Sequence, residues 1–298
     1  MPRDMVMAAL VTLALAAPAA AQSTSSTQPR LVNGRLAAQA AGSRLEATFR
    51  SLVAAQSDPA WIGYAVPIAP GDRTMCCYGD DWITSCSLER SRTIGGAVTR
   101  SRAAVSGPIK LEGADSMIVL FRVDGKAVQK VRTFTPDCEL DAGGRTIHWL
   151  EGVAPADSIA LLATLVTRDD QKRDRVSGGA LAAISMHQDP AADSTLIRLA
   201  RQDTSAKVRG EALFWLAQKA GQQAAAEITA AIEQDPDTEV KRRAVFALSQ
   251  LPKDEGVPLL IQVARTNKNP VVRKQAMFWL GQSRDPRALD FFAEVLSR

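Results

Sequence analysis

The residues best suited to covalent chemistry are four cysteines, all in the first half of the chain: Cys76, Cys77, Cys86 and Cys138. The start of the chain, described below, predicts export, and an even number of cysteines in an exported protein predicts two disulfides. Adjacent cysteines rarely bond each other, and on a strand their side chains face opposite sides. We therefore expect Cys76 and Cys77 each to bond one of Cys86 and Cys138, which leaves two pairings open.

Other site chemistry finds little support in the sequence. The C-x₂₋₄-C spacing of zinc sites and the C-x-x-C motif of redox enzymes are both absent. The two histidines, His148 and His187, lie in different parts of the chain, and no H-E-x-x-H, G-x-S-x-G or P-loop motif occurs. We predict no catalytic residue, no metal and no cofactor. The alternative is a peptide or cell-wall enzyme, which would need a polar cleft holding Asp80, Asp81 or His148.

A motif that occurs three times at one spacing dominates the second half of the chain. The pattern V-[RK]-x₂-A-x-F-x-L-x-Q covers residues 208–218, 240–250 and 272–282, with an offset of 32 residues (240 − 208 = 272 − 240 = 32). A fainter copy lies one period upstream, at Val176, Ala180 and Ile184. A fixed period in this range predicts a solenoid, in which each unit buries its apolar face by stacking on its neighbours. That architecture favours a binding scaffold over a pocket enzyme.

Helical geometry divides each copy of the motif into two faces. In the first copy one arc of the helix holds the residues expected in the core: Val208, Ala212, Trp215 and Leu216. Phe214, Phe246 and Phe278 point away from that arc. They could form an exposed binding stripe, or each could pack into the groove beside the turn of the next unit. The predicted stripe consists of Phe214, Gln218, Arg242, Arg243, Phe246, Gln250, Lys274, Phe278 and Gln282.

These units resemble HEAT repeats of the short type named after phycobilisome lyases, over residues 155–298. In that family an Asp ends the first helix and a Val-Arg pair opens the second, six positions later. Asp203 and Arg209 match this pattern, as do Asp235 and Lys241, whereas Asn267 precedes Arg273 in the third copy. The resemblance implies that these residues form a structural ladder between stacked units. It also implies that the second helices line a concave surface, where the Phe position is usually polar.

The first part of the chain has the character of a β domain. Strands are predicted at 61–66, 74–78, 117–123, 127–134 and 146–150. Asn33-Gly34 predicts a local hairpin, and the spacing of apolar residues predicts a helix over 43–56. We expect a compact antiparallel domain over 31–154. An alternative role for the chain is an envelope structural or regulatory protein that binds through exposed aromatics near Trp61, Tyr78 and Trp82.

Helices are predicted from residue 155 to the end of the chain. Asp157-Ser158 could cap a helix that runs to Val166. Helical hairpins are expected at 174–202, 206–234, 238–266 and 270–297, with a proline near the start of several helices. The predicted fold class is thus α+β and multidomain, with a disulfide-bonded antiparallel β domain followed by an all-α HEAT-like solenoid.

The N-terminus has the pattern of a signal peptide over residues 1–21. Arg3 precedes an apolar run at 6–17, and Ala19 and Ala21 fit a cleavage site before Gln22. Residues 22–30 form a polar linker. The net charge of +4 is spread along the chain, which argues against nucleic-acid binding, and no later segment is apolar enough to span a membrane. We predict a periplasmic or secreted protein with a protein or peptide partner in the cell envelope.

Overall fold

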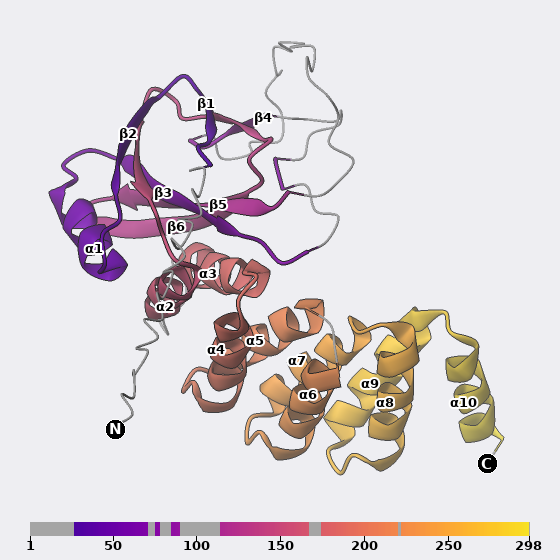
Figure 1. Cartoon of the computed structure of the whole chain (residues 1–298). Helices are drawn as coiled ribbons and strands as arrows, with labels where there is room; N and C mark the ends of the chain where they lie inside the picture. The colour runs from indigo at the N-terminus through magenta and orange to yellow at the C-terminus, as the bar shows by residue number, and fades with distance from the viewer. Residues whose placement is uncertain are drawn as a thin grey trace, which may run out of the picture.

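A layered β structure stands at one end of the molecule and an array of paired helices extends from it (Figure 1). The computed structural model describes residues 27–70, 75–77, 85–89, 114–166, 174–219 and 222–297. The predicted signal peptide lies outside these residues, as do Tyr78, Trp82 and the pair Asp80 and Asp81. No helix in the described part of the chain is long and apolar enough to cross a membrane.

Two sheets make up the β structure. The larger has the order β2-β8-β3-β5-β6, and the smaller has the order β1-β7-β4. The strands of the larger sheet are β2 (Arg35–Ala40), β8 (Thr146–Glu151), β3 (Ala60–Pro67), β5 (Ser116–Asp124) and β6 (Ala127–Phe134). Those of the smaller sheet are β1 (Arg30–Val32), β7 (Glu139–Asp141) and β4 (Ser85–Ser87). The predicted hairpin of β5 and β6 is confirmed, with its turn at Gly125 and Lys126, which both have positive φ.

The expectation of an antiparallel domain is wrong for much of the β structure. β2 pairs with β8 in parallel, β8 with β3 in parallel, and both pairings of the smaller sheet are parallel. The hairpin expected at Asn33-Gly34 is absent because β1 and β2 belong to different sheets. The segments 30–40 and 139–151 instead run side by side in the same direction. Backbone hydrogen bonds at the crossing between the sheets, such as Gly144 N–H to Asn33 O at 2.7 Å, keep them together.

The larger sheet is buried on both faces, and the alternation of side chains along its central strands divides two cores. On β5, Val119 and Phe121 point into the core shared with the helices, whereas Ile118 and Leu120 point toward the smaller sheet. This arrangement follows from the period of two along a strand. The helix predicted at 43–56 is confirmed as α1 (Leu45–Ala55), which places Phe49 against Phe121 with ring centroids 4.7 Å apart.

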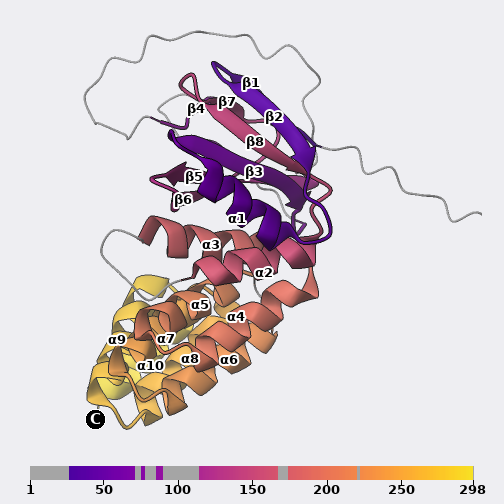
Figure 2. The same ribbon diagram turned by 90° about the vertical axis from the view of Figure 1, so that its left-hand side faces the viewer.

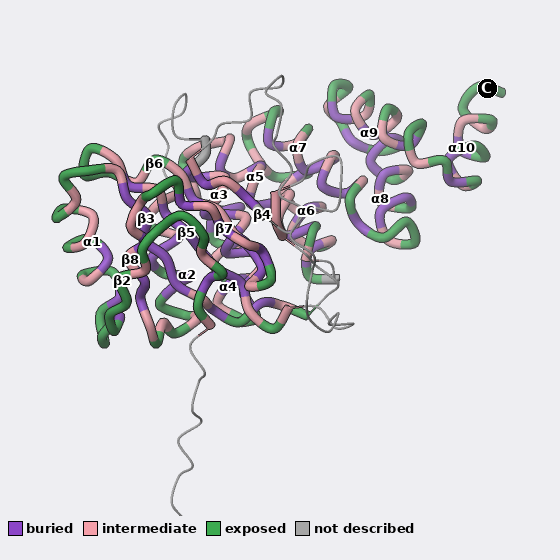
Figure 3. Tube along the Cα trace, turned by 90° about the horizontal axis from the view of Figure 1, so that it is seen from above, coloured by how far each residue is buried: buried purple, intermediate pink, exposed green. Residues whose placement is uncertain are grey.

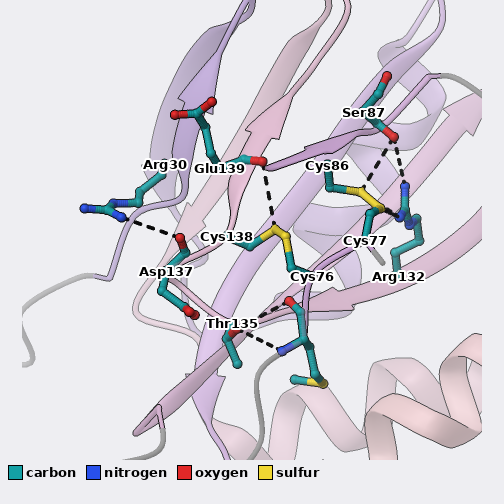
Figure 4. The surroundings of a disulfide bond; sticks show 11 residues. Arg30, Cys76, Cys77, Cys86, Ser87, Arg132, Thr135, Asp137, Cys138 and Glu139 are labelled. Atoms are coloured by element: carbon teal, nitrogen blue, oxygen red, sulfur yellow. Dashed lines mark hydrogen bonds between the residues drawn. A yellow bond between two sulfur atoms is a disulfide. The ribbon is translucent and has the colours of Figure 1, made fainter. Parts of the chain in front are cut away.

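Two disulfides tie the smaller sheet to the segment at residues 75–77 (Figure 4). Cys76 bonds Cys138 and Cys77 bonds Cys86, with Cα–Cα distances of 5.5 Å and 5.0 Å. The prediction that the adjacent cysteines take different partners is confirmed, and one of the two open pairings is selected. The strand expected at 74–78 is not formed by residues 75–77; there the backbone N–H of Met75 donates to Thr135 Oγ1 at 3.0 Å.

The helical hairpins predicted from the repeat are confirmed. They are α3 (Asp174–Met186) with α4 (Pro190–Gln202), α5 (Ala206–Lys219) with α6 (Gln222–Gln234), α7 (Thr238–Ser249) with α8 (Lys253–Thr266), and α9 (Pro270–Ser283) with α10 (Pro286–Leu296). Helices α3, α5, α7 and α9 contact one another in one layer, and α2, α4, α6 and α8 form a second. Buried segments recur along the helices of both layers (Figure 3).

The helix before these hairpins, α2 (Pro155–Leu165), begins differently from the prediction. Its N-cap is Ala154, with no side-chain cap and with proline in the first turn, so Asp157 and Ser158 do not cap it. Ser158 is instead fully buried within the helix. The side chains of Asp189, Asp237, Asn269 and Asp285 do cap later helices, each accepting from the N–H two residues on.

The sheet and the helices share one continuous apolar core. Figure 2 shows α2 and α3 lying between the sheet and the remaining helices. Helix α3 approaches β6 so closely that a Cβ at Gly179 would lie 2.4 Å from the carbonyl oxygen of Val131, which only glycine avoids. The domain boundary predicted at residue 154 thus falls in the short turn between β8 and α2, but packing continues across it.

A buried polar chain joins the sheet to the helices. His187 Nε2 lies 2.8 Å from Ser158 Oγ, which lies 2.8 Å from the hydroxyl of Tyr64 on β3. His187 Nδ1 lies 2.8 Å from the carbonyl oxygen of Ala183. A carbonyl only accepts, so Nδ1 carries the proton and Nε2 of the neutral ring accepts from Ser158, whose oxygen accepts in turn from Tyr64. These three side chains are fully buried, and burial raises the pKa of Tyr64.

The buried imidazole should make stability depend on pH. Burial lowers the pKa of His187 to about 4, whereas the pKa of a histidine in the unfolded chain is about 6.5. Between these values the unfolded chain binds more protons, so stability falls as the pH falls through this window, by about 3 kcal/mol in total. His187→Gln should flatten this part of the curve in urea unfolding measured from pH 7.5 to pH 4.

His148→Gln is the matched control, because His148 lies on β8 outside the polar chain and burial lowers its pKa as well. The control variant should flatten this window much less than His187→Gln, because His148 is only partly buried whereas His187 is fully buried. Equal slopes in wild type and His187→Gln would contradict the assignment.

Candidate protein-binding face

A row of aromatic side chains follows the surface of α5, α7 and α9. We define the aromatic row as Phe214, Trp215, Phe246, Phe278 and Trp279. Its rings touch in sequence across the helices: the centroids of Phe214 and Phe246 are 5.7 Å apart and nearly parallel, at 3°. Phe246 and Trp279 are 4.9 Å apart, and Trp279 and Phe278 are 4.9 Å apart. Three consecutive helices of one layer thus present a single aromatic surface.

Helical phase explains why the phenylalanines stay near the surface. Val208, Ala212 and Leu216 lie on the buried face of α5, as predicted. Phe214 lies off that face and is half-buried, as is Phe246, and Phe278 is 53% exposed. The structure therefore does not bury these rings between repeats. They pack against one another at the surface and remain open to solvent on one side.

The tryptophans of the row were placed less well by the sequence. Helical phase predicts Trp215 on the core arc, but the structure leaves it partly buried, and the sequence pattern does not predict the role of Trp279. The two residues occupy equivalent positions in their repeats, and Ala247 stands between them in the middle copy. Ala247 has no ring of its own, and the neighbouring Phe246 contacts Trp279 of the next repeat directly. A Trp-Ala-Trp alternation beside three identical phenylalanines was the signal available in the sequence.

A small cavity of about 200 Å³ opens beside Trp279, between α9 and the turn that links α7 to α8. Its lining combines apolar side chains such as those of Leu248 and Leu260 with polar ones, among them those of Gln250, Lys253 and Gln282. The indole N–H of Trp279 is buried and has no acceptor among the described residues. A buried donor without a partner costs free energy, and an oxygen atom supplied by a ligand would relieve that cost.

The remaining residues of the predicted stripe surround the row. Gln218, Gln250 and Gln282 are exposed at the ends of their helices, and Lys274 is exposed on α9. The two arginines of α7 have local partners: Arg242 pairs with Glu239 at 2.9 Å, and Arg243 lies 3.5 Å from Glu239 and 4.0 Å from Glu211. These ion pairs leave the surroundings of the row polar without a strong net charge.

The residues of the predicted ladder make different contacts in each repeat. Arg209 holds the Asp235 carboxylate with two hydrogen bonds, of 2.8 Å and 2.9 Å, and donates to the carbonyl oxygen of Asp203. It thus links one repeat to the next. Lys241 donates to the Glu233 carbonyl oxygen, and Arg273 donates to that of Asn267. The bidentate rung between Arg209 and Asp235 therefore has no carboxylate counterpart at Lys241 or Arg273 among the described residues.

Asn267 explains part of this difference. Its side chain occupies the position of Asp235 in the preceding copy, and its amide donates to the Glu233 carboxylate at 3.2 Å. Its side-chain oxygen accepts from the N–H of Asn269, as the Asp235 carboxylate does from Asp237. The turn geometry is thus kept in both copies, while the link between repeats changes from an ion pair to an amide–carboxylate bond.

The alternative sites have less structural support than the aromatic row. Trp61 is fully buried and donates to Glu89 at 2.8 Å, so it is not an exposed aromatic of the β domain. His148 lies on β8, and the described residues include no group of three or more His, Cys, Asp or Glu side chains that could hold a metal. A more open cavity of about 440 Å³ lies between α1 and α2, where Arg50 pairs with Glu46.

The bidentate rung should contribute measurably to stability. The side chains of Arg209 and Asp235 are only 11% and 7% exposed, and removing one partner of such a pair leaves a nearly buried charge. Arg209→Met should lower the free energy of unfolding by about 2 kcal/mol. Arg265→Met, which breaks the exposed inter-repeat pair with Glu294, should cost much less in the same urea titration. Similar losses in the two variants would refute the special role of the rung.

Comparison with known proteins identifies the repeat type in part of the chain. Residues 225–298 match the HEAT repeat family. No curated protein matches the sequence. Among solved structures, human deoxyhypusine hydroxylase in complex with glycerol is 19% identical with a TM-score of 0.32, over 46% of this chain and 43% of that one. The chain thus spans less than half the length of that protein.

Two further structures show similar values. The complex of CpcE and CpcF of phycocyanin lyase from a Nostoc species is 16% identical with a TM-score of 0.36, over 47% of this chain and 89% of that one. The Escherichia coli protein YibA is 23% identical with a TM-score of 0.33, over 47% and 53%. The family match makes the C-terminal quarter of this chain similar in sequence to HEAT repeats. Helical hairpins continue upstream from it to α3.

Proposed function

We propose that this chain is a non-catalytic protein-binding module that holds an apolar segment of a partner protein or peptide on the aromatic row. The observation that carries the proposal is the row itself: three phenylalanines at equivalent positions, linked by ring contacts that run through Trp279. All three remain open to solvent, and Phe278 at the end of the row is 53% exposed. Contiguous exposed aromatics rimmed by polar groups are typical of protein interaction sites. HEAT repeats also suggest a role in protein interaction.

Preorganisation supports the same function. The rings already hold one another in place across α5, α7 and α9, so a partner would lose less free energy in ordering them. The cavity beside Trp279 could take one anchoring side chain, and an oxygen atom of the partner could accept from the buried indole N–H. The exposed amides Gln218, Gln250 and Gln282 provide a polar rim with both donors and acceptors.

Export to the periplasm or the medium is part of the proposal, with cleavage after Ala21 and a partner in the cell envelope. The signal-like pattern at residues 1–21 supports it. The two disulfides support it as well, since such bonds persist mainly in oxidising compartments. No cofactor or nucleic acid is part of the proposed function.

Binding through the aromatic row can be tested with peptides selected from a displayed random library against the mature protein. The affinity of a selected peptide is then measured by tryptophan fluorescence, because Trp215 and Trp279 belong to the row. The triple variant Phe214→Ser, Phe246→Ser, Phe278→Ser should bind about 100-fold more weakly, since it removes the central apolar contacts. Far-ultraviolet circular dichroism and urea unfolding first establish that the variant is folded.

The matched control removes exposed apolar surface elsewhere in the array. Leu289 and Leu296 on α10 are 69% and 85% exposed and lie outside the row. The double variant Leu289→Ser, Leu296→Ser should bind the same peptides with wild-type affinity. Selected peptides that bind the triple variant as tightly as wild type would place recognition outside the row.

The proposed processing gives a separate expectation. Intact-mass measurement and N-terminal sequencing of the protein purified from the envelope fraction or the medium should give a chain that begins at Gln22. A chain that retains residues 1–21 would contradict cleavage and indicate an uncleaved anchor instead.

A further inference from the structure

The two disulfides of the β structure differ in their electrostatic surroundings. Arg132, on β6, places its Nη2 atom 2.9 Å from Cys77 Sγ and 3.0 Å from Cys86 Sγ (Figure 4). Its Nη1 atom donates to the carbonyl oxygen of Ser87 at 3.4 Å, and its guanidinium lies 4.6 Å from the centroid of the Phe134 ring. One cation thus contacts both sulfur atoms of one disulfide.

This cation lacks an anionic partner within the described residues. The surroundings of its guanidinium are a carbonyl oxygen, an aromatic ring and two sulfur atoms. Burial lowers the pKa of Arg132, and no described carboxylate offsets the effect. Arg132 is partly buried, and a charge that is partly withdrawn from water and poorly compensated favours any change that brings an anion next to it. Reduction of the adjacent disulfide produces such an anion, a thiolate.

The second disulfide provides an internal comparison. The sulfur of Cys138 lies 3.9 Å from the carbonyl oxygen of Glu139, and Cys138 is 1% exposed. Among the described residues no cation contacts the bond between Cys76 and Cys138. Cys86 Sγ also lies near a carbonyl oxygen, that of Ser87 at 3.7 Å, so the Arg132 guanidinium is what distinguishes a thiolate formed at the two bonds.

We propose that the bond between Cys77 and Cys86 is a site of thiol–disulfide exchange with a dithiol reductant, whereas the bond between Cys76 and Cys138 is a structural link. Cys77 is half-buried and Cys86 is 2% exposed, so Cys77 is the more accessible of the two to an external thiolate. Attack forms a mixed disulfide between the reductant and Cys77, and the bond between Cys77 and Cys86 breaks. The electron pair of that bond remains on Cys86 Sγ, where Arg132 stabilises the thiolate.

The second step completes the exchange. The other thiolate of the reductant attacks its own sulfur in the mixed disulfide and releases Cys77 as a thiolate or, after protonation, a thiol. The reductant becomes a cyclic disulfide, so two electrons pass from the dithiol to the protein. Arg132 raises the rate of exchange, because a stabilised thiolate is a better leaving group. It also shifts the equilibrium toward the reduced protein, because the reduced form contains that thiolate.

Opening of this bond has a limited structural effect. Cys86 lies on β4, the edge strand of the smaller sheet, and β4 remains paired with β7 through residues 85–87. The segment at residues 75–77 remains tied by the bond between Cys76 and Cys138. Exchange therefore releases one link between residue 77 and β4 without separating either from the sheet.

The test uses the full mature protein equilibrated with graded ratios of reduced to oxidised dithiothreitol at pH 7. Thiols are trapped with iodoacetamide, and peptide mass spectrometry reports the oxidised fraction of each disulfide separately. In wild type, Cys77 and Cys86 should become reduced at a lower ratio than Cys76 and Cys138. Arg132→Met should raise the ratio required for Cys77 and Cys86 about tenfold. The ratio for Cys76 and Cys138 should not change.

Arg132→Lys is the conservative control, because it keeps the charge near the sulfur atoms and should retain most of the wild-type behaviour. A common midpoint for both disulfides, or an unchanged midpoint in Arg132→Met, would overturn the proposal. Should Arg132→Met fail to fold, the alkylation rate of partly reduced wild type is followed against pH. A pKa of Cys77 and Cys86 well below the ordinary value of about 8.5 supports the proposal, and the ordinary value overturns it.

Discussion

The arrangement of the rest of the molecule depends on the close contact of α3 with β6. A helical repeat buries its apolar face only against a neighbour, so the first repeat of an array needs a surface that is not a repeat. Here the larger sheet supplies that surface. Because Gly179 has no side chain, the α3 backbone can approach the carbonyl oxygen of Val131 more closely than a Cβ atom would allow. From α3 the layer continues through α5, α7 and α9, and each helix packs against the equivalent helix of the preceding repeat. The sheet thus acts as the cap of the array.

Polar groups at this junction and between repeats meet their hydrogen-bonding needs in two ways. At the junction, Tyr64, Ser158 and His187 form a neutral chain in which each group satisfies the next, so no charge is buried. Between repeats, Arg209 and Asp235 form a charged pair whose planar groups match in two hydrogen bonds. The neutral chain orients the sheet against α2 and α3, and the ion pair holds the register of two successive turns. Both fix geometry that apolar packing alone would leave free to slide.

The sequence predicted the helical half in detail because its information is local and repeated. A 3.6-residue period, a proline at the start of several helices and a short cap before them define each hairpin, and every copy reinforces the others. The β half depends on pairings between distant segments. The parallel run of 30–40 beside 139–151 has no local signature, and Asn33-Gly34 gave a hairpin signal for a bend between two sheets. Of the site, the phenylalanines followed from helical phase, whereas the place of Trp279 required the contact with Phe246 across two helices.

The ring contacts bear on whether the phenylalanines serve packing alone. Phe246, in the middle, contacts a ring on each side, from Phe214 and from Trp279, and is half-buried by them. Phe278 stands at the end of the row, contacts Trp279 of its own helix and leaves 53% of its surface in water. Packing between repeats accounts for the middle ring but gives little reason for a large apolar side chain at the end. A surface that continues onto a partner accounts for both, because the exposed ring then extends the contact that the inner rings begin.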